Sequence, residues 1–377
     1  MRPLPPMLLV LLLWAAGLGA AAQFGKVSIL YETLRATYGG GGEVALGLVV
    51  SIVGVVGLIF GTTAGLLVAR IGPRRAIVAA LAAGAAMSAL QSLLPAYPLM
   101  LASHLAIVVV GPTMIASTAP EHRRPLAMTL WSSFFGVTYA ILALIGPHAS
   151  PAGLFLGHAA YMAVLAVILA ATLPPDPRTQ ALPLGNLLRR HAEIYTSPRL
   201  AAPAMGFCCY TFLYVAVLTL LPPETPATHR ALIAAGMPLV SIAVSLTLGV
   251  WLLGRMRAVA LVQAGYAVAI PGFLILWAFW GQGGGMVAGG FLLSAALGIV
   301  QGASFASIPE LNASADDRAR AAGAVAQLGN LGTTTGTPAL AALLASAGPS
   351  GLTIAAVLLS ALGIAIHAVQ KARRARP

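Results

Sequence analysis

The sequence GTTAGLLVARIGPRRA, at residues 61–76, places three arginines between two long apolar segments of the chain. The arginines are Arg70, Arg74 and Arg75, and Gly72 followed by Pro73 interrupts the helical pattern between them. A short basic connection between two apolar segments of membrane-spanning length is typical of a cytoplasmic loop in a multi-spanning protein. The stretch therefore predicts two transmembrane helices joined on the cytoplasmic side.

The composition favours a membrane protein. Apolar residues make up 59% of the 377 residues and charged residues only 8%, whereas about 25% charged residues is usual in a soluble domain. So few charged side chains cannot cover the surface of a soluble fold. The net charge of +12 is spread over short loops and forms no continuous patch, which argues against a nucleic-acid partner. The adjacent Cys208 and Cys209 cannot build a disulfide framework.

Twelve apolar segments long enough to cross a bilayer follow one another along the chain. They cover residues 7–34, 44–69, 76–94, 98–119, 125–147, 152–173, 200–221, 231–253, 258–280, 285–308, 318–346 and 350–370. Continuous runs rich in Ala and Leu favour helices over the alternating pattern of a membrane β-barrel. The sequence thus predicts an all-α polytopic membrane protein with 12 transmembrane helices.

The distribution of basic residues predicts the orientation. With the N-terminus placed inside, the inner segments hold 18 of the 21 lysines and arginines. Only Arg35 and Arg230 fall in outer loops, and Lys26 lies within the first span. This asymmetry predicts a multi-pass protein of the cell inner (plasma) membrane with cytoplasmic N- and C-termini.

The N-terminus has a second interpretation. Arg2, the apolar residues 7–18 and the alanines at 20–22 also match a cleavable secretory signal. We favour a membrane span, because the apolar run continues toward Leu34 and because cleavage would destroy the internal repeat of the chain.

That repeat divides the chain into two similar halves. Pro120-Glu121 follows the fourth segment and Pro309-Glu310 follows the tenth, each shortly before two basic residues. Gly254-Arg255 after the eighth segment weakly resembles the Arg70 loop. Parallel repeats joined by a central linker predict two six-helix bundles. The predicted boundaries are an N-terminal bundle at 1–173, a cytoplasmic linker at 174–199 and a C-terminal bundle at 200–377.

The spacing Gly65-x-x-x-Ala69-Arg70-x-Gly72-x-Arg74-Arg75 resembles the loop 2–3 signature of the major facilitator superfamily, Gly-x-x-x-Asp-Arg-x-Gly-Arg-Arg. Ala69 stands where that family has Asp, and Pro73 stands where it usually has a basic residue. The resemblance implies a secondary transporter in which two pseudo-symmetric bundles alternate access to a site between inside and outside.

The resemblance also implies a cytoplasmic gate. The family's motif Asp takes part in it, and Ala69 cannot replace that carboxylate. We expect the arginines to hold the gate against Glu121, Glu310 or helix C-termini, with plain anchoring by positive charge as the alternative. The predicted gate residues are Gly65, Arg70, Gly72, Arg74, Arg75, Glu121 and Glu310.

Polar side chains within spans are candidates for solute binding, because they are costly in lipid unless they face protein or water. Lys26 shares a helical face with Gln23, and its alternatives are a position at the outer interface or a pair with Glu32. In the eleventh segment Gln327, Asn330 and Thr334 form one stripe near the midplane, with helix packing through nearby glycines as the alternative. The predicted substrate-binding residues are Gln23, Lys26, His104, Tyr210, Tyr214, Gln301, Gln327, Asn330 and Thr334.

Two methionine–histidine pairs at helical spacing offer a different chemistry. They are Met100 with His104 and His158 with Met162. Imidazole and thioether groups on one face suit a soft metal such as Cu(I), so a copper importer is an alternative function. Coupling to protons through His104 is another, since the reference pKa of histidine is about 6.5. Uniport is equally compatible with the sequence.

The spans contain no acidic residue at mid-membrane depth. Transporters of cationic solutes need a buried carboxylate, so a small neutral or anionic solute is the expected partner, together with the lipid bilayer. We expect no cofactor, no resident metal and a monomer. No paired carboxylates, HExxH or Walker A sequence is present, so an enzyme is not expected. A non-transporting receptor or assembly factor on the same fold is the second alternative.

Overall fold

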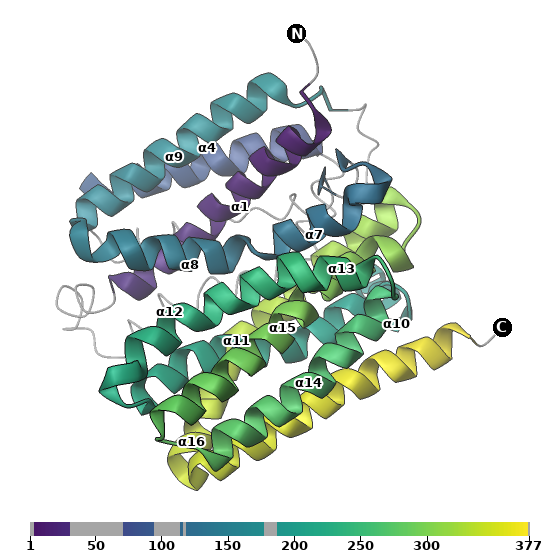
Figure 1. The fold of residues 1–377 in the computed structure, drawn as a ribbon. Coiled ribbons are helices and arrows are strands. Elements are labelled where there is room, and N and C mark those ends of the chain that lie inside the picture. Colours follow the sequence, from purple (N-terminus) through teal and green to yellow (C-terminus); the bar gives the residue numbers. More distant parts are fainter. Residues whose placement is uncertain (1–3, 31–70, 94–113, 116–117, 177–186, 376–377) are drawn as a thin grey trace. The chain divides into compact units, whose positions relative to one another are not determined.

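A computed structural model describes residues 4–30, 71–93, 114–115, 118–176 and 187–375, and every regular element in these ranges is a helix (Figure 1). The chain divides into two compact units by its internal contacts. Unit 1 comprises Met1–Ala127 and Phe134–Gly185, and unit 2 comprises Met128–Ser133 and Asn186–Pro377. The division after Gly185 falls within the predicted linker at 174–199.

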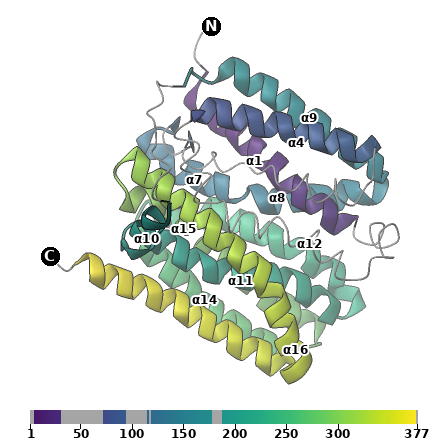
Figure 2. The ribbon, with the colours of Figure 1, turned by 180° about the vertical axis from the view of Figure 1, so that it is seen from behind.

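Unit 1 is a bundle of long apolar helices. They are α1 (Pro6–Ile29), α4 (Pro73–Leu93), α8 (Phe134–Ile145) and α9 (Pro151–Thr172), while α7 (Arg124–Ser132) contributes its first residues to this unit. Two short 3-10 helices, Glu121–Arg123 and Gly146–His148, precede α7 and follow α8. Helices α4 and α9 lie side by side in both views (Figures 1 and 2), and Leu81 and Leu169 are fully buried in the core.

Unit 2 contains the remaining helices. They are α10 (Leu187–Thr196), α11 (Ala201–Glu224), α12 (Ala227–Val244), a π-helical turn (Ser245–Gly249), α13 (Val250–Leu253), α14 (Ala258–Ala278), α15 (Gly283–Leu311) and α16 (Ala315–Arg374). Helix α16 is interrupted at Gly348, whose φ of 62° and ψ of −160° are not helical and which precedes Pro349. The interruption coincides with the predicted break between the segments 318–346 and 350–370.

Local sequence signals explain several helix ends. Ser150 caps α9, because its Oγ accepts a hydrogen bond from the backbone N–H of Gly153 at 3.1 Å. Ser314 caps α16 in the same way, accepting from the N–H of Asp317 at 3.0 Å. The carboxylates of Asp316 and Asp317 in the first turn of α16 add a favourable interaction with the helix dipole.

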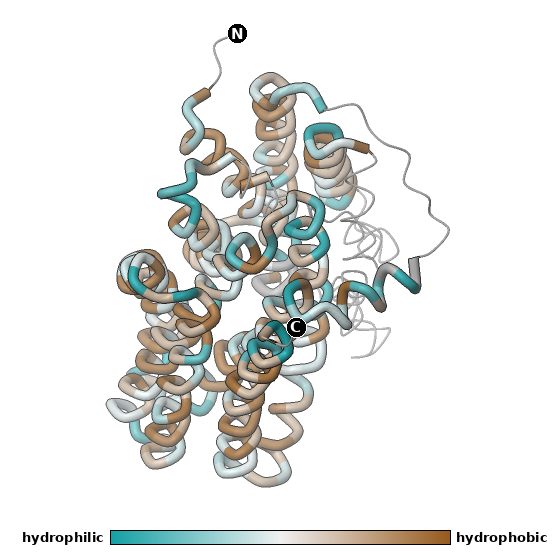
Figure 3. Tube along the Cα trace, turned by 90° about the vertical axis from the view of Figure 1, so that its right-hand side faces the viewer, coloured by the Kyte–Doolittle hydropathy of each residue, from teal (hydrophilic) through white to brown (hydrophobic). Residues whose placement is uncertain are grey.

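Nine helices in the described ranges are long and apolar enough to cross a membrane. Large apolar side chains are exposed on these helices, including Val167 at 69% and Leu358 at 65%. Figure 3 shows hydrophobic residues running along the helices of each unit. An apolar exterior is what a lipid environment requires, so the prediction of a polytopic all-α membrane protein is confirmed. The predicted second segment, 44–69, and most of the fourth, 98–119, lie outside the described residues.

Glycine determines how closely α11 and α16 approach. A Cβ atom on Gly332 would lie 2.6 Å from the carbonyl oxygen of Cys208 and 2.8 Å from the backbone nitrogen of Phe212. Gly329 lies close to the ring of Phe207, and Gly336 lies close to the backbone of Phe212, so a Cβ atom at either position would crowd its neighbour. A stripe of small residues of this kind lets two membrane helices pack backbone to backbone.

Candidate functional site

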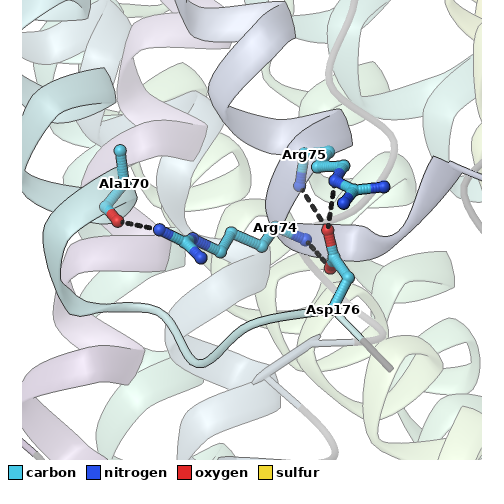
Figure 4. A network of polar contacts seen from close by, with 4 residues as sticks. All are labelled: Arg74, Arg75, Ala170 and Asp176. Atoms are coloured by element: carbon cyan, nitrogen blue, oxygen red, sulfur yellow. Dashed lines mark hydrogen bonds and ion pairs between the residues drawn. The ribbon is translucent and has the colours of Figure 1, made fainter. Parts of the chain in front are cut away.

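The basic loop of the predicted gate is completed by a carboxylate from a distant part of the chain. Helix α4 begins at Pro73, and Asp176 lies just beyond the end of α9. One carboxylate oxygen of Asp176 accepts a hydrogen bond from the backbone N–H of Arg74 at 2.7 Å, and the other accepts from that of Arg75 at 3.0 Å (Figure 4). Asp176 therefore caps the positive end of α4.

The two arginine side chains have different partners. The Nε of Arg75 lies 3.9 Å from the Oδ2 of Asp176, whose side chain is only 3% exposed. The guanidinium of Arg74 points away from Asp176 and donates to the carbonyl oxygen of Ala170 in the last turn of α9 (Figure 4). In unit 1 the loop thus binds the C-terminal end of α9 and the residues that follow it.

Gly72 is required by this arrangement. Its φ is +96°, a value that side chains with a Cβ atom rarely adopt. A Cβ atom there would lie 2.6 Å from the Cβ of Asp176 and closer still to its carboxyl group. The glycine of the motif therefore makes room for the capping carboxylate.

Unit 2 caps a helix in the same manner. One oxygen of Glu310, at the end of α15, accepts from the backbone N–H of Ala258 at the start of α14, with a distance of 2.6 Å. Its other oxygen lies 3.6 Å from the Nε of Arg257. Of the other predicted gate residues, Glu121 is exposed, and Gly65 and Arg70 lie outside the described residues.

Lys26 lies inside unit 1 and not at an interface with water. Its side chain, in the last turn of α1, is 1% exposed. The ammonium Nζ lies 2.8 Å from the Oγ of Ser88 on α4 and 2.8 Å from the Nδ1 of His158 on α9. It also lies 4.4 Å from the centroid of the Phe155 ring. Gln23, one turn earlier, is buried too.

The same contacts bear on the methionine–histidine pairs. The Nε2 of His158 lies 2.8 Å from the carbonyl oxygen of Gly19, so both ring nitrogens have partners and neither is left for a metal ion. Met162 packs against Gly19 and Gly84. Met100 and His104 lie outside the described residues. Within the described part of the chain, no group of three or more His, Cys, Asp or Glu side chains is arranged to hold a metal.

The predicted tyrosines belong to an aromatic column in unit 2. Tyr210 stacks on Phe207 with centroids 5.1 Å apart and on Tyr214 with centroids 5.3 Å apart. The ring of Phe305 on α15 meets Phe207 edge-on at 5.1 Å. Tyr210 and Tyr214 are only 3% and 7% exposed, so the column forms part of the core of unit 2.

The polar stripe of α16 lies opposite its glycines. Thr334 is two residues away from both Gly332 and Gly336, and Asn330 is two residues away from Gly332, a spacing that corresponds to about 200° around an α-helix. Because the glycines face α11, the stripe points away from that interface and its side chains remain half-buried. Helix packing against α11 therefore does not explain the stripe.

The amide candidates have specific contacts. The Nδ2 of Asn330 donates to the carbonyl oxygen of Ala326 at 2.7 Å, one turn back in its own helix. The Oε1 of Gln327 accepts from the Oη of Tyr195 on α10 at 2.6 Å. The Nε2 of Gln301 donates to the carbonyl oxygen of Ser132 within unit 2.

Sequence reasoning missed Asp176 and Ser88. The run Pro174-Pro175-Asp176-Pro177 was a usable signal for Asp176, because it ends a helix and places an acid beside it. Ser88 lies among alanines in α4 and carries no signal of its own. Its role is visible only once α1, α4 and α9 are together.

The sequence is similar to those of known membrane transport proteins. A sequence profile described as Major Facilitator Superfamily matches residues 9–336. The inner membrane transport protein YajR of Escherichia coli K12 is 27% identical over 202 residues, which is 50% of this chain and 44% of that relative. The alignment therefore spans less than half of YajR.

Two solved structures share the fold. The human organic anion transporter MFSD10 has a TM-score of 0.81 at 16% identity, with 97% of this chain and 100% of that one covered. The E. coli fucose:proton symporter FucP has a TM-score of 0.75 at 17% identity, with 99% and 100% covered. At this level of identity the likeness is one of fold.

Proposed function

Because the chain belongs to the major facilitator superfamily, we propose that this multi-pass membrane transporter is a secondary transporter that moves a small neutral or anionic solute by alternating access. Unit 1 and unit 2 are the two bundles whose relative motion would expose the site to each side in turn. We further propose that it lies in the cell inner membrane with both termini in the cytoplasm, in agreement with the positive-inside distribution of its arginines.

The observation that carries the solute class is the position of the carboxylates. Every acidic residue in the described ranges lies at a helix end, in a connection or on the short helix α10: Glu121, Asp176, Glu193, Glu224, Glu310, Asp316 and Asp317. Among the described residues, the buried polar side chains of the long helices carry amides, hydroxyls, imidazoles and one ammonium. Amide and hydroxyl groups bind neutral or anionic solutes, but they do not compensate a cation in a low-dielectric site.

The stripe on α16 is the proposed solute contact. Asn330 and Thr334 lie on the face opposite the glycines, and both side chains are half-buried. The hydroxyl of Thr334 can donate to a solute and accept from it, and the amide oxygen of Asn330 adds an acceptor. Two relatives of the same fold are named for solutes of these two charge types, an organic anion and a neutral sugar.

A thermal-shift series tests the charge preference. A solute that binds only the folded protein raises its melting temperature. Benzoate, benzamide and benzylamine share one ring and differ in charge, and a library of organic acids, sugars, vitamins and their amine analogues extends the comparison. We expect the hits among the acids and neutral compounds. A set of hits confined to the amines would contradict the proposal.

Two neighbouring threonines provide a matched test of the contact residues. Thr334→Val removes a hydroxyl from the polar stripe and should weaken binding of a thermal-shift hit about 5- to 10-fold, the value of one hydrogen bond. Thr335→Val is the control, because Thr335 is exposed on another face and its hydroxyl donates to the carbonyl oxygen of Leu331. Isothermal titration should show no loss of affinity in the control. Equal losses in both variants would exclude the stripe as the contact.

A further inference from the structure

Lys26 brings a cationic group into the core of unit 1 without a carboxylate partner among the described residues. The side chains around its Nζ are Ser88 from α4, and His158 and Phe155 from α9. Lys26 and Ser88 are 1% and 0% exposed, and His158 is 7% exposed. A buried ionisable group with such specific neighbours in a membrane protein is a candidate functional site.

The hydrogen bonds define where each hydrogen lies. The carbonyl oxygen of Gly19 can only accept, so the Nε2 of His158 carries a hydrogen and donates to it. In a neutral imidazole the Nδ1 then has a free lone pair, which accepts from Lys26 at 2.8 Å. The hydroxyl of Ser88 accepts from Lys26 at 2.8 Å, and its own hydrogen has two acceptors within reach, the carbonyl oxygen of Phe155 at 2.9 Å and the Nδ1 of His158 at 3.1 Å. The third N–H of the ammonium points over the Phe155 ring.

One proton can occupy either member of the pair. It lies on Lys26 in the arrangement above. If it crosses the 2.8 Å hydrogen bond, His158 becomes an imidazolium that donates from Nδ1 to the lone pair of a neutral Lys26 and from Nε2 to Gly19. Protonation of both groups would place two positive charges 2.8 Å apart in a buried site, which repulsion prevents. The pair therefore holds one proton or none, with a net charge of +1 or zero.

No other described charge is in contact with the pair. Helix α8 presents Tyr139, whose ring packs near Gly25, and α9 presents Tyr161, whose hydroxyl donates to the carbonyl oxygen of Ala15. Helix α4 presents the neutral side chains Ser88 and Gln91. As far as the described residues determine it, the charge of the pair is thus set by the proton itself.

We propose that Lys26 and His158 together form a proton-binding site that takes up and releases one proton without a carboxylate from the described part of the chain. The inference rests on the proposed function, for which this proton would be the coupling ion. On release, the N–H bond of Lys26 over the Phe155 ring breaks, the electron pair stays on Nζ and the proton passes to water. The amine keeps its hydrogen bonds to Ser88 and His158, so the bundle remains assembled in both states.

The lysine content of the chain makes the site directly observable. Lys26 and Lys371 are the only lysines in the sequence, and Lys371 is exposed at the end of α16. Full-length protein labelled with 15N-lysine in lipid nanodiscs should give two Nζ signals, which a Lys371→Arg variant assigns. We expect the Lys26 signal to change with pH, because the pair takes up and releases one proton. A Lys26 signal that stays the same at every pH at which the protein remains folded would overturn the proposal.

A second variant tests the partner. His158→Gln removes the imidazole that shares the proton, so the pH at which the Lys26 signal changes should shift. His148→Gln is the control, since His148 is exposed beyond α8, and it should leave the Lys26 signal in place. An unchanged Lys26 titration in His158→Gln would exclude the pair. Neither readout depends on solute movement, so a failed proton site and a failed transport assignment can be told apart.

Discussion

Gly332→Ala is expected to lower the melting temperature of the protein more than Gly157→Ala, although both substitutions add a single methyl group. The added Cβ would lie 2.6 Å from the carbonyl oxygen of Cys208 and 2.8 Å from the backbone nitrogen of Phe212. Backbone atoms cannot move aside as the end of a side chain can, so α11 and α16 must separate. We expect a loss of about 2 kcal/mol, in the range of overpacked cores, despite the higher helix propensity of alanine.

Gly157→Ala is the matched control for this change. Gly157 lies in α9 with nothing within 4 Å of the position that its Cβ would occupy. The alanine should therefore leave the melting temperature unchanged or raise it slightly, because it only removes backbone freedom. Thermal unfolding in the same detergent compares the melting temperatures of the two variants. Equal melting temperatures would show that α11 and α16 are not packed as closely as described.

Asp176→Ala is expected to have the second largest effect. It removes two hydrogen bonds to the backbone N–H groups at the start of α4 and the ion pair with Arg75. The loss of a buried helix cap of this kind costs about 1–2 kcal/mol. Asp176→Asn keeps an acceptor but loses the charge, so its melting temperature should lie between those of the wild type and Asp176→Ala.

The control for this prediction is an exposed carboxylate. Glu193 pairs with Arg189 one turn away on α10, and 47% of its side chain is exposed. Glu193→Ala should cost no more than about 0.5 kcal/mol, the value of a surface pair at this spacing. If Asp176→Ala proved as mild as Glu193→Ala, the cap would have no structural importance.

Features that repeat along one helix were predictable from the sequence. Apolar length and turn residues located the long helices, including the break at Gly348 between two of them. Helix packing through the nearby glycines was the alternative to solute contact in the eleventh segment, and the structure places Gly329, Gly332 and Gly336 against α11. Such features depend on neighbours three or four residues apart.

Contacts between helices were not predictable in the same way. Lys26 bonds to Ser88 and His158, which are 62 and 132 residues away. Asp176 is 102 residues from Arg74. A periodic pattern identifies the face of a helix but not the helix that meets it, so Lys26 was placed at the cavity or the outer interface. The bundle of α1, α4 and α9 instead surrounds it.

The polar stripe on α16 was predicted from the sequence, but its relation to the neighbouring helices is visible only in the structure. The sequence periodicity placed Asn330 and Thr334 on one face of the helix. Solute contact and helix packing were the two possible explanations of that face. The structure assigns packing against α11 to the glycines on the opposite face. The contribution of the stripe to solute binding stays a prediction, and the threonine pair tests it.

Counterflow tests the central claim most directly. Full-length protein in proteoliposomes is preloaded with an unlabelled thermal-shift hit and diluted into a trace of the same compound carrying a radiolabel. A transporter that alternates access should accumulate the label transiently, in a saturable manner and above protein-free liposomes. A compound that raises the melting temperature and yet shows no entry above the protein-free control would contradict transport. It would identify the protein as a receptor on a transporter fold.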